Sequence, residues 1–201
     1  MKFSLDPRYC PLISFPEEER AFLSKWLRRS AWEPEDYDPD EVPGRAFLES
    51  DHKTVPDFVP IHARMGMAPE ARALVEELEP GVHQSFPVEI VRKRGKRPIH
   101  RLDGRVLDTP YYAPNVRTFL DAVWVERSEV RVTRLVGRPP MVTKRPRNDN
   151  IVLRRGVVAG HHLWRGRYQL EGKYLFFSDA LARAVEAKRF RKLEFTRLEE
   201  A

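Results

Sequence analysis

The sequence has a single cysteine, Cys10, and no long apolar run. One cysteine cannot form a disulfide bond within the chain, and such sparse use of cysteine is typical of a reducing compartment. No stretch approaches the ~20 apolar residues that a membrane-spanning helix needs. The segment from Met1 to Arg8 also lacks the apolar core of a signal peptide. We therefore expect a cytoplasmic protein with no membrane partner.

Sequence patterns that indicate catalysis are missing as well. The phosphate-binding pattern GxxxxGK[ST], the dinucleotide pattern GxGxxG and the nucleophile pattern GxSxG do not occur. Zinc patterns of the CxxC or HExxH type are absent, and the adjacent His161 and His162 would point to opposite faces of a strand. Asp103, Asp108 and Asp121 are candidates for acid–base chemistry, but no spacing brings them together. We expect no enzyme, no cofactor and no metal site.

The composition is that of a globular chain. Of the 201 residues, 41% are hydrophobic and 33% are charged, and a chain of this size buries roughly 70% of its unfolded surface. The 17 prolines favour irregular connections over a helical bundle. We predict a single α+β domain with a mostly antiparallel sheet and three or so helices. Residues 1–54, a helix with an acidic proline-rich loop, and residues 55–201, an α+β domain, are expected to form one compact unit.

Charge is distributed unevenly along the chain. Residues 1–60 contain 8 Lys and Arg against 13 Asp and Glu, whereas residues 133–201 contain 16 against 7. Such a gradient can steer a charged partner, and it can also be ordinary solvated surface. Both interpretations stay open at this stage.

Apolar periodicity and capping signals predict helices at residues 16–31, 69–79 and 179–189. Pro16 and Pro69 suit the first helical position, and Ser178 suits the N-cap of the last helix. The inner edge predicted for that helix consists of Leu181, Ala184, Val185 and Lys188.

Strands are predicted at residues 55–59, 86–91, 99–106, 151–158, 161–165, 174–177 and 193–198. The basic segment 92–97 is expected to join two of them as a hairpin, with Gly95 in the left-handed conformation.

Three stretches carry weaker signals. Residues 115–136 fit both helical and strand periods, so their structure stays open. We expect an acidic loop at residues 33–45 and a basic loop at residues 137–150.

Two segments are candidates for binding a partner. The first is the basic turn, which contains Arg92, Lys93, Arg94, Lys96 and Arg97. The second contains His161, Trp164, Arg165 and Arg167. Charged turns and Trp or Arg side chains are common anchors at interfaces. Lysine and arginine clusters also bind phosphate backbones, but the basic turn lacks the interleaved aromatics that stack on bases.

A series of short motifs in order carries a family resemblance. The motifs are Pro56-Asp57-Phe58, Leu78-Glu-Pro-Gly, His83-Gln-Ser-Phe-Pro-Val-Glu-Ile90, Tyr111-Tyr112 with Asn115-Val116, Asp121-Ala122, Ser128, His162-Leu-Trp-Arg165, Phe176-Phe-Ser-Asp179 and Leu193-Glu-Phe195. Together they resemble the polymorphic-toxin immunity protein family first recognised in myxobacteria, the eleventh in the numbered immunity series. The sequence departs from that family at Trp124, where an Asp is usual, and at Arg191, where a Gly is usual.

The resemblance implies a binding function. Members of the family are encoded beside secreted toxins, so this chain would neutralise a cognate toxin, encoded by an adjacent gene, by forming a stoichiometric complex. Asn115, Asp121 and Ser178 are then interpreted as structural caps and turns. Because the chain is basic overall, we expect either an acidic toxin or contact through the acidic first segment. The alternative is a basic nucleic-acid-binding regulatory module, and homodimerisation through an edge strand stays open.

Overall fold

The computed structural model of the chain describes residues 2–5, 11–19, 35–49, 52–62, 64–95, 97–133, 141–144, 150–166, 175–190 and 193–201. The helices among them are α2 (Pro69–Leu78), α3 (Arg155–Val158), α4 (Asp179–Ala187) and the short 3₁₀ turns η2 (Glu17–Glu19), η3 (Pro39–Glu41) and η4 (Val125–Arg127). The strands are β1 (Lys2–Leu5), β2 (Ile13–Ser14), β3 (Arg45–Leu48), β4 (Thr54–Val55), β5 (Phe58–Ile61), β6 (Arg64–Met67), β7 (Gln84–Arg92), β8 (His100–Arg101), β9 (Tyr111–Asn115), β10 (Phe119–Leu120), β11 (Val130–Thr133), β12 (Met141–Lys144), β13 (Val152–Leu153), β14 (Leu163–Gly166), β15 (Leu175–Phe177), β16 (Leu193–Thr196) and β17 (Glu199–Glu200).

A six-stranded sheet closes on itself in the order β2-β3-β7-β9-β6-β5. Its long strand β7 alternates buried and exposed residues, which places Phe86, Val88 and Ile90 inside the sheet. These side chains pack with Tyr111 in one of the apolar cores. The Tyr111 hydroxyl is buried, and it donates a hydrogen bond to the Pro56 carbonyl at 3.0 Å.

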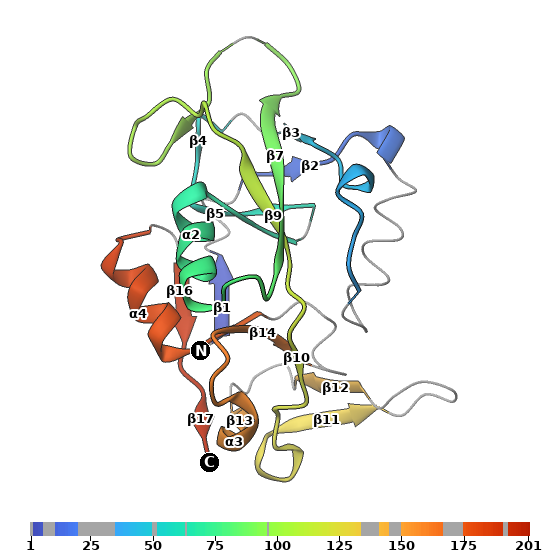
Figure 1. Cartoon of the computed structure of the whole chain (residues 1–201), viewed down its shortest axis with the longest axis vertical. Helices are drawn as coiled ribbons and strands as arrows, with labels where there is room; N and C mark the ends of the chain where they lie inside the picture. Colours follow the sequence, from blue (N-terminus) through green and yellow to red (C-terminus); the bar gives the residue numbers. More distant parts are fainter. Residues whose placement is uncertain are drawn as a thin grey trace.

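A five-stranded sheet, ordered β10-β14-β15-β1-β16, lies below the closed sheet in Figure 1. Neighbouring residues of β14 and β15 enter different cores. Leu163 and Phe177 pack with α2 and α4, whereas Trp164 and Phe176 pack on the other face. This sheet is therefore buried on both faces at β14 and β15. Burial on both faces explains why neither strand alternates between buried and exposed residues.

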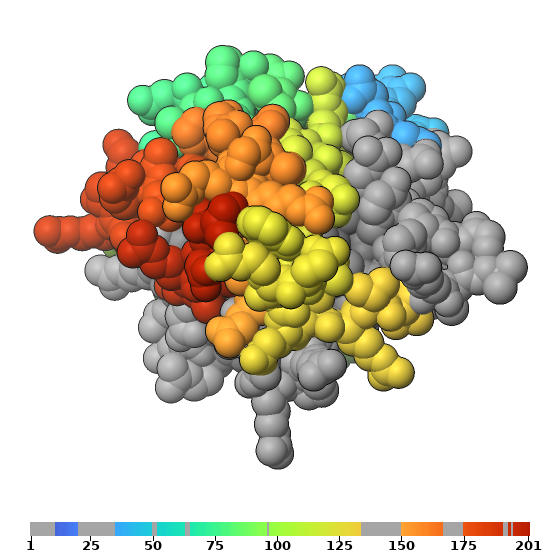
Figure 2. All heavy atoms as spheres, turned by 90° about the horizontal axis from the view of Figure 1, so that it is seen from below, coloured from blue at the N-terminus to red at the C-terminus, as the bar shows by residue number. Residues whose placement is uncertain are grey.

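The last residues of the chain pack in the core that contains Trp164 and Phe176. Strand β17 pairs with β13 in parallel, and Leu198 packs beside Ile151 and Leu153. Seen from below, residues 193–201 lie between residues 150–166 and 115–133 on one face of the molecule (Figure 2). Most strand pairs are antiparallel, so the chain has the α+β, mostly antiparallel architecture predicted from its sequence. Among the described residues, no helix combines the length and apolar character needed to cross a membrane.

Two predicted helices are confirmed. Helix α2 begins at Pro69, and α4 begins after Ser178, whose hydroxyl accepts a hydrogen bond from the Leu181 amide at 3.1 Å. The predicted helix at 16–31 lies mostly outside the described residues, and its described part, Glu17–Glu19, is a 3₁₀ turn.

The predicted hairpin of residues 86–91 with residues 99–106 is wrong. Strand β7 has its two edges occupied by β3 and β9, so neither edge is available to the following segment. That segment forms only the short strand β8, which pairs in parallel with β4. Gly95 does take the expected left-handed conformation, with φ +80°.

Three further expectations need correction. Residues 141–144 of the predicted basic loop form β12, which pairs with β11. The predicted strand at 151–158 is the short β13 followed by α3. His161 and His162 precede β14 instead of lying on it. The stretch 115–136, whose structure the sequence left open, has no α-helix in its described part, where the short strands β10 and β11 flank η4.

Candidate partner-binding site

A buried arginine, Arg101, organises a cluster of charged side chains. Arg101 ends β8, and its side chain is only 8% exposed. Its guanidinium makes a bidentate contact with Glu70 through two 2.8 Å hydrogen bonds and donates a third to Asp57 at 3.0 Å. Glu70 lies in the first turn of α2, and Asp57 lies between β4 and β5. Fork-to-fork pairing of this kind fixes the geometry as well as adding energy.

A tight turn adds a second arginine to this cluster. Gly104, at φ +91°, lets residues 101–105 fold back, and its amide donates to the Arg101 carbonyl at 3.0 Å. Arg105 then pairs with Asp103 at 2.7 Å and reaches Glu70 at 3.4 Å. The hydrogen bond from Arg101 is the largest influence on Glu70 and lowers its pKa below the ordinary value. The hydrogen bond from Arg105 lowers the pKa of Asp103 in the same way.

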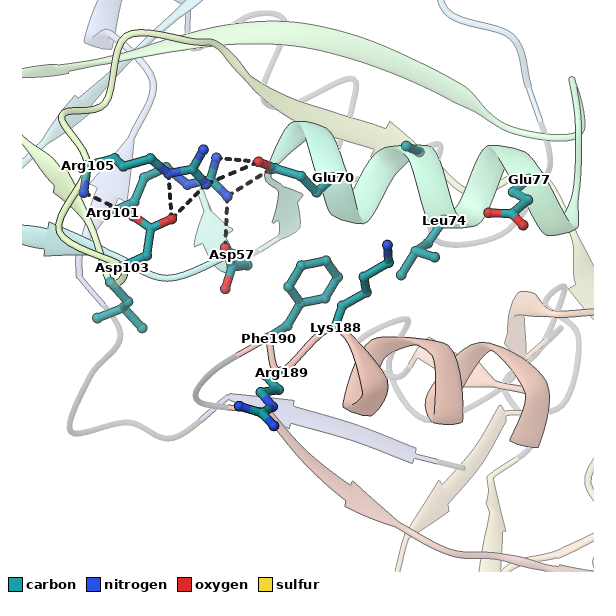
Figure 3. Close-up of a pocket in the computed structure, with 12 residues that line it drawn as sticks. Asp57, Glu70, Leu74, Glu77, Arg101, Asp103, Arg105, Lys188, Arg189 and Phe190 are labelled. Carbon is teal, nitrogen blue, oxygen red and sulfur yellow. Dashed lines mark hydrogen bonds and ion pairs between the residues drawn. The ribbon is translucent and has the colours of Figure 1, made fainter.

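The cluster forms one end of a pocket of about 420 Å³ between α2 and the end of α4. We call this pocket the α2–α4 groove. Its lining residues are Asp57, Glu70, Ala73, Leu74, Glu77, Arg101, Leu102, Asp103, Arg105, Lys188, Arg189 and Phe190. Figure 3 shows that α2 forms one wall and that the Lys188 side chain extends from the opposite wall toward α2. Lys188 is exposed, so the predicted inner edge of α4 holds only for its apolar members.

The end of α4 has an unusual backbone. Arg189 has φ +55°, a conformation that glycine adopts freely and other residues rarely do. The Arg189 amide donates to the Glu186 carbonyl at 2.9 Å, and the Phe190 amide donates to the Val185 carbonyl at 3.4 Å. The Phe190 ring packs edge-to-face on Phe58, with centroids 5.8 Å apart. This ring anchors the end of the helix beside the groove.

A second pocket, of about 370 Å³, shares Glu70, Arg101 and Arg105 with the α2–α4 groove. It is lined by Pro69, Glu70, Arg101, Arg105, Val106, Asp108 and Thr109. Val106 is 51% exposed, which is high for a large apolar side chain. The charged cluster therefore lines both pockets.

Two side chains of the basic turn, Arg92 and Lys93, are held by contacts within the protein. Arg92 donates to the Arg97 carbonyl at 3.0 Å and to the His52 carbonyl at 3.1 Å, so it holds the turn closed. Lys93 forms an ion pair with Glu49 at 2.7 Å. Arg94 and Arg97 are exposed, and Lys96 lies outside the described residues.

The residues of the second predicted binding segment differ in how far they are exposed to solvent. His161 is half-buried, and Arg167 lies outside the described residues. Trp164 is 1% exposed and stacks on Phe176, with ring centroids 5.8 Å apart. Arg165 is 5% exposed. Neither Trp164 nor Arg165 offers a surface that a partner can contact in this structure.

A buried Glu–His pair that sequence reasoning missed joins α2 to β14. Glu79 accepts hydrogen bonds from the amides of His162, at 2.8 Å, and Leu163, at 3.0 Å. It also contacts Nε2 of His83 at 2.7 Å. Burial acts to raise the pKa of Glu79, but these hydrogen bonds outweigh it and hold the pKa below its ordinary value. The four-residue spacing of Glu79 and His83 was the available signal, although α2 itself ends at Leu78.

The remaining polar candidates serve separate structural contacts. Asn115 is buried and donates to the Glu35 carbonyl and the Gln84 side chain, at 2.7 and 2.9 Å. Asp121 lies 4.0 Å from Arg154, whereas Asp103 pairs with a different residue, Arg105. Within the described ranges, no group of three or more His, Cys, Asp and Glu side chains is arranged to hold a metal ion.

Comparison with known proteins gives one finding. No curated protein matches the chain. A protein-family model does match, that of the immunity protein family (Imm11), over residues 18–200. The matched segment includes α2, the 101–105 turn and α4, and therefore the whole α2–α4 groove.

Proposed function

The chain belongs to the Imm11 immunity protein family, and from this premise we propose that it binds a cognate secreted bacterial toxin and neutralises it. Neutralisation occurs in a stoichiometric complex that keeps the toxin from its target. The family match over residues 18–200 is the observation that carries the proposal. The toxin is the product of an adjacent gene, and the complex forms in the cytoplasm of the producing cell or its kin.

Binding accounts for the described chemistry better than catalysis. Two of the three acids that were candidates for acid–base work serve different ion pairs, Asp103 with Arg105 and Asp121 with Arg154. The carboxylates of Asp57 and Glu70 are held in ion pairs with Arg101, as structural groups are. We infer that the protein acts without turnover.

Charge supplies the first contact with the toxin. Arg94 and Arg97 present exposed cations at the tip of the basic turn, which Arg92 holds in shape. Asp36, Asp38 and Asp40 lie exposed in the acidic segment. Either an acidic toxin meets the first set or a basic toxin meets the second, because complementary charge speeds encounter.

The test is capture followed by rescue. Tagged protein is used to pull down the products of the genes on either side of its own gene, and any product that binds is expressed with and without this chain. A one-to-one complex that restores growth supports the proposal, and light scattering of the complex reports whether this chain is a monomer or a dimer within it.

The control is the toxin expressed with an unrelated protein of similar size and charge. If no flanking product binds and none is neutralised, toxin immunity is ruled out for this chain. Retention on random duplex DNA that falls steeply with salt would then favour the nucleic-acid-binding alternative.

A further inference from the structure

We propose that an acidic surface of the toxin docks on the basic turn, at a patch of cations formed by Lys53, Arg94 and Arg97 around the side chain of Arg92. We call this patch the Arg92 platform. The inference rests on the proposed function, and it decides which of the two charged segments meets the toxin.

The Arg92 guanidinium brings two segments of the chain together. Its Nε donates to the Arg97 carbonyl at 3.0 Å, and its Nη2 donates to the His52 carbonyl at 3.1 Å. Lys53 directly follows His52, so Lys53 and Arg97 both lie beside the same guanidinium. Figure 1 shows β4 and the segment that follows β7 at one end of the molecule, away from the five-stranded sheet.

The charge of this surface is strongly positive. Residues 49–53 and 92–97 contain six Lys and Arg against two Asp and Glu. One cation and one carboxylate of this set lie outside the described residues. The described carboxylate, Glu49, is already bound by the Lys93 ammonium at 2.7 Å and by the Ser14 hydroxyl at 2.6 Å. It therefore leaves the other cations of the surface without a counterion.

Three cations of the platform are free to bind a partner. Among the described residues, Lys53, Arg94 and Arg97 are exposed, and their side chains take part in no ion pair or hydrogen bond. Like charges held close together repel one another, and carboxylates that a partner places among them remove that repulsion. The platform therefore favours an acidic partner over a basic one.

The acidic segment at residues 35–41 has less charge to offer. The Asp36 carboxylate is paired with Arg117 at 2.9 Å. The Asp38 carboxylate accepts a hydrogen bond from the Asp40 amide at 3.0 Å, at the start of η3. Because these carboxylates already have partners within the protein, the basic turn is the better anchor of the two segments.

The side chains of the platform suit carboxylates better than a nucleic acid. Arg94 and Arg97 can each donate a fork of hydrogen bonds to a carboxylate. Residues 49–53 and 92–97 contain no Phe, Tyr or Trp on which a base could stack. Arg92 also holds the turn in shape before a partner arrives, which lowers the cost of ordering it on binding.

The test uses the flanking gene product captured in the pull-down, purified in an inactivated form, and measures its association by stopped-flow mixing at low salt. Arg94→Glu/Arg97→Glu should slow association about tenfold or more, because two attractive charges become repulsive. Arg94→Lys/Arg97→Lys keeps the charge and should retain most of the rate. The midpoint of thermal unfolding should change little in both variants, since neither side chain has a hydrogen bond or ion pair to lose.

Arg183→Glu/Lys188→Glu is the matched control, because it makes the same charge change at two exposed positions of α4 outside the platform. It should slow association much less. Equal slowing by the control, or a wild-type rate in Arg94→Glu/Arg97→Glu, would overturn the platform assignment and leave the immunity proposal intact.

Two other results would also overturn the assignment. Slower association in Asp38→Lys/Asp40→Lys, with no effect of Arg94→Glu/Arg97→Glu, would place the contact on the acidic segment. Retention on random duplex DNA that Arg94→Glu/Arg97→Glu abolishes, with capture of the toxin unchanged, would make the platform a nucleic-acid site. A wild-type chain that neither binds nor neutralises any flanking product fails at the earlier step, and the platform assignment fails with it.

Discussion

At the scale of single residues, two buried charged side chains, Arg101 and Glu79, each join distant segments of the chain. Arg101 brings together α2, β8 and the segment before β5 through hydrogen bonds to the carboxylates of Glu70 and Asp57. Glu79 joins the end of α2 to the start of β14 by accepting two backbone amides. Both are placed by contacts between segments far apart in the sequence, and both leave a costly unpaired group behind if one partner is removed.

Replacing Glu79 with Gln should lower the free energy of unfolding by about 2 kcal/mol at pH 7, because one amide oxygen cannot replace a carboxylate that accepts several bonds. The loss should depend on pH. The pKa of Glu79 is lowered from 4.5 in the folded state, so its stabilisation is complete above pH 4.5 and is lost as the pH falls through the folded value.

Urea unfolding of wild type and Glu79→Gln over that pH range measures the difference. Glu186→Gln, the same change at an exposed position of α4, is the control and should be nearly neutral. A difference between wild type and Glu79→Gln that stays constant down to low pH would show that the carboxylate charge is not the source of the stability.

At the scale of elements, α4 begins with a side-chain cap from Ser178 and is followed by Arg189 in a left-handed backbone conformation. The Ser178 hydroxyl caps the helix through the Leu181 amide, and it also lies 2.8 Å from Nδ1 of His162. This links the cap to the same backbone segment that Glu79 holds. Leu181, Ala182 and Val185 then bury the inner face against α2 and β15. The groove depends on this packing, because it fixes where the end of α4 lies.

Ser178→Ala should destabilise the protein by about 1–2 kcal/mol, which for a chain of this size lowers the melting temperature by roughly 2–8 °C. Ser178→Thr keeps a capping hydroxyl and should recover most of the loss. Differential scanning calorimetry of the two variants checks this. Equal destabilisation by both would assign the effect to packing around the side chain and not to the cap.

At the scale of the whole molecule, the described residues form three apolar cores along the two main sheets. One fills the closed sheet, one lies under α2 and α4, and one covers the far face of β14 and β15. Alternate residues of β14 and β15 enter the second and third cores, so these strands couple the two. The surface around this body has a net charge of +6 distributed as an acidic first segment and a basic last third.

That distribution should make capture of the toxin depend on salt. Raising the ionic strength from about 0.05 to 0.5 M should slow association about tenfold or more while changing dissociation less, because screening acts mainly on the encounter. Stopped-flow mixing with the captured toxin measures both rates. An association rate that does not change with salt would rule out electrostatic steering by either charged segment.

Local signals in the sequence determined several elements on their own. Pro69 with the spacing of Ala71, Leu74 and Val75 defined α2, and Ser178 with Leu181 and Val185 defined α4. Helix starts and helix faces depend on residues within one or two turns, so they can be read directly from the chain. The order of short motifs was also enough to indicate the family that the match over residues 18–200 shows.

Only the tertiary structure decided the strand pairing and the groove. Nothing near residues 86–91 reveals that β3 and β9 occupy both edges of β7 and leave residues 99–106 without a hairpin partner. The groove is lined by Arg101 and by Lys188 and Arg189, which are far from it in the sequence. Trp164 and Arg165, which were predicted to contact a partner, are buried because β14 is covered on both faces. Pairing and burial depend on which distant segments meet, and a local pattern does not encode that choice.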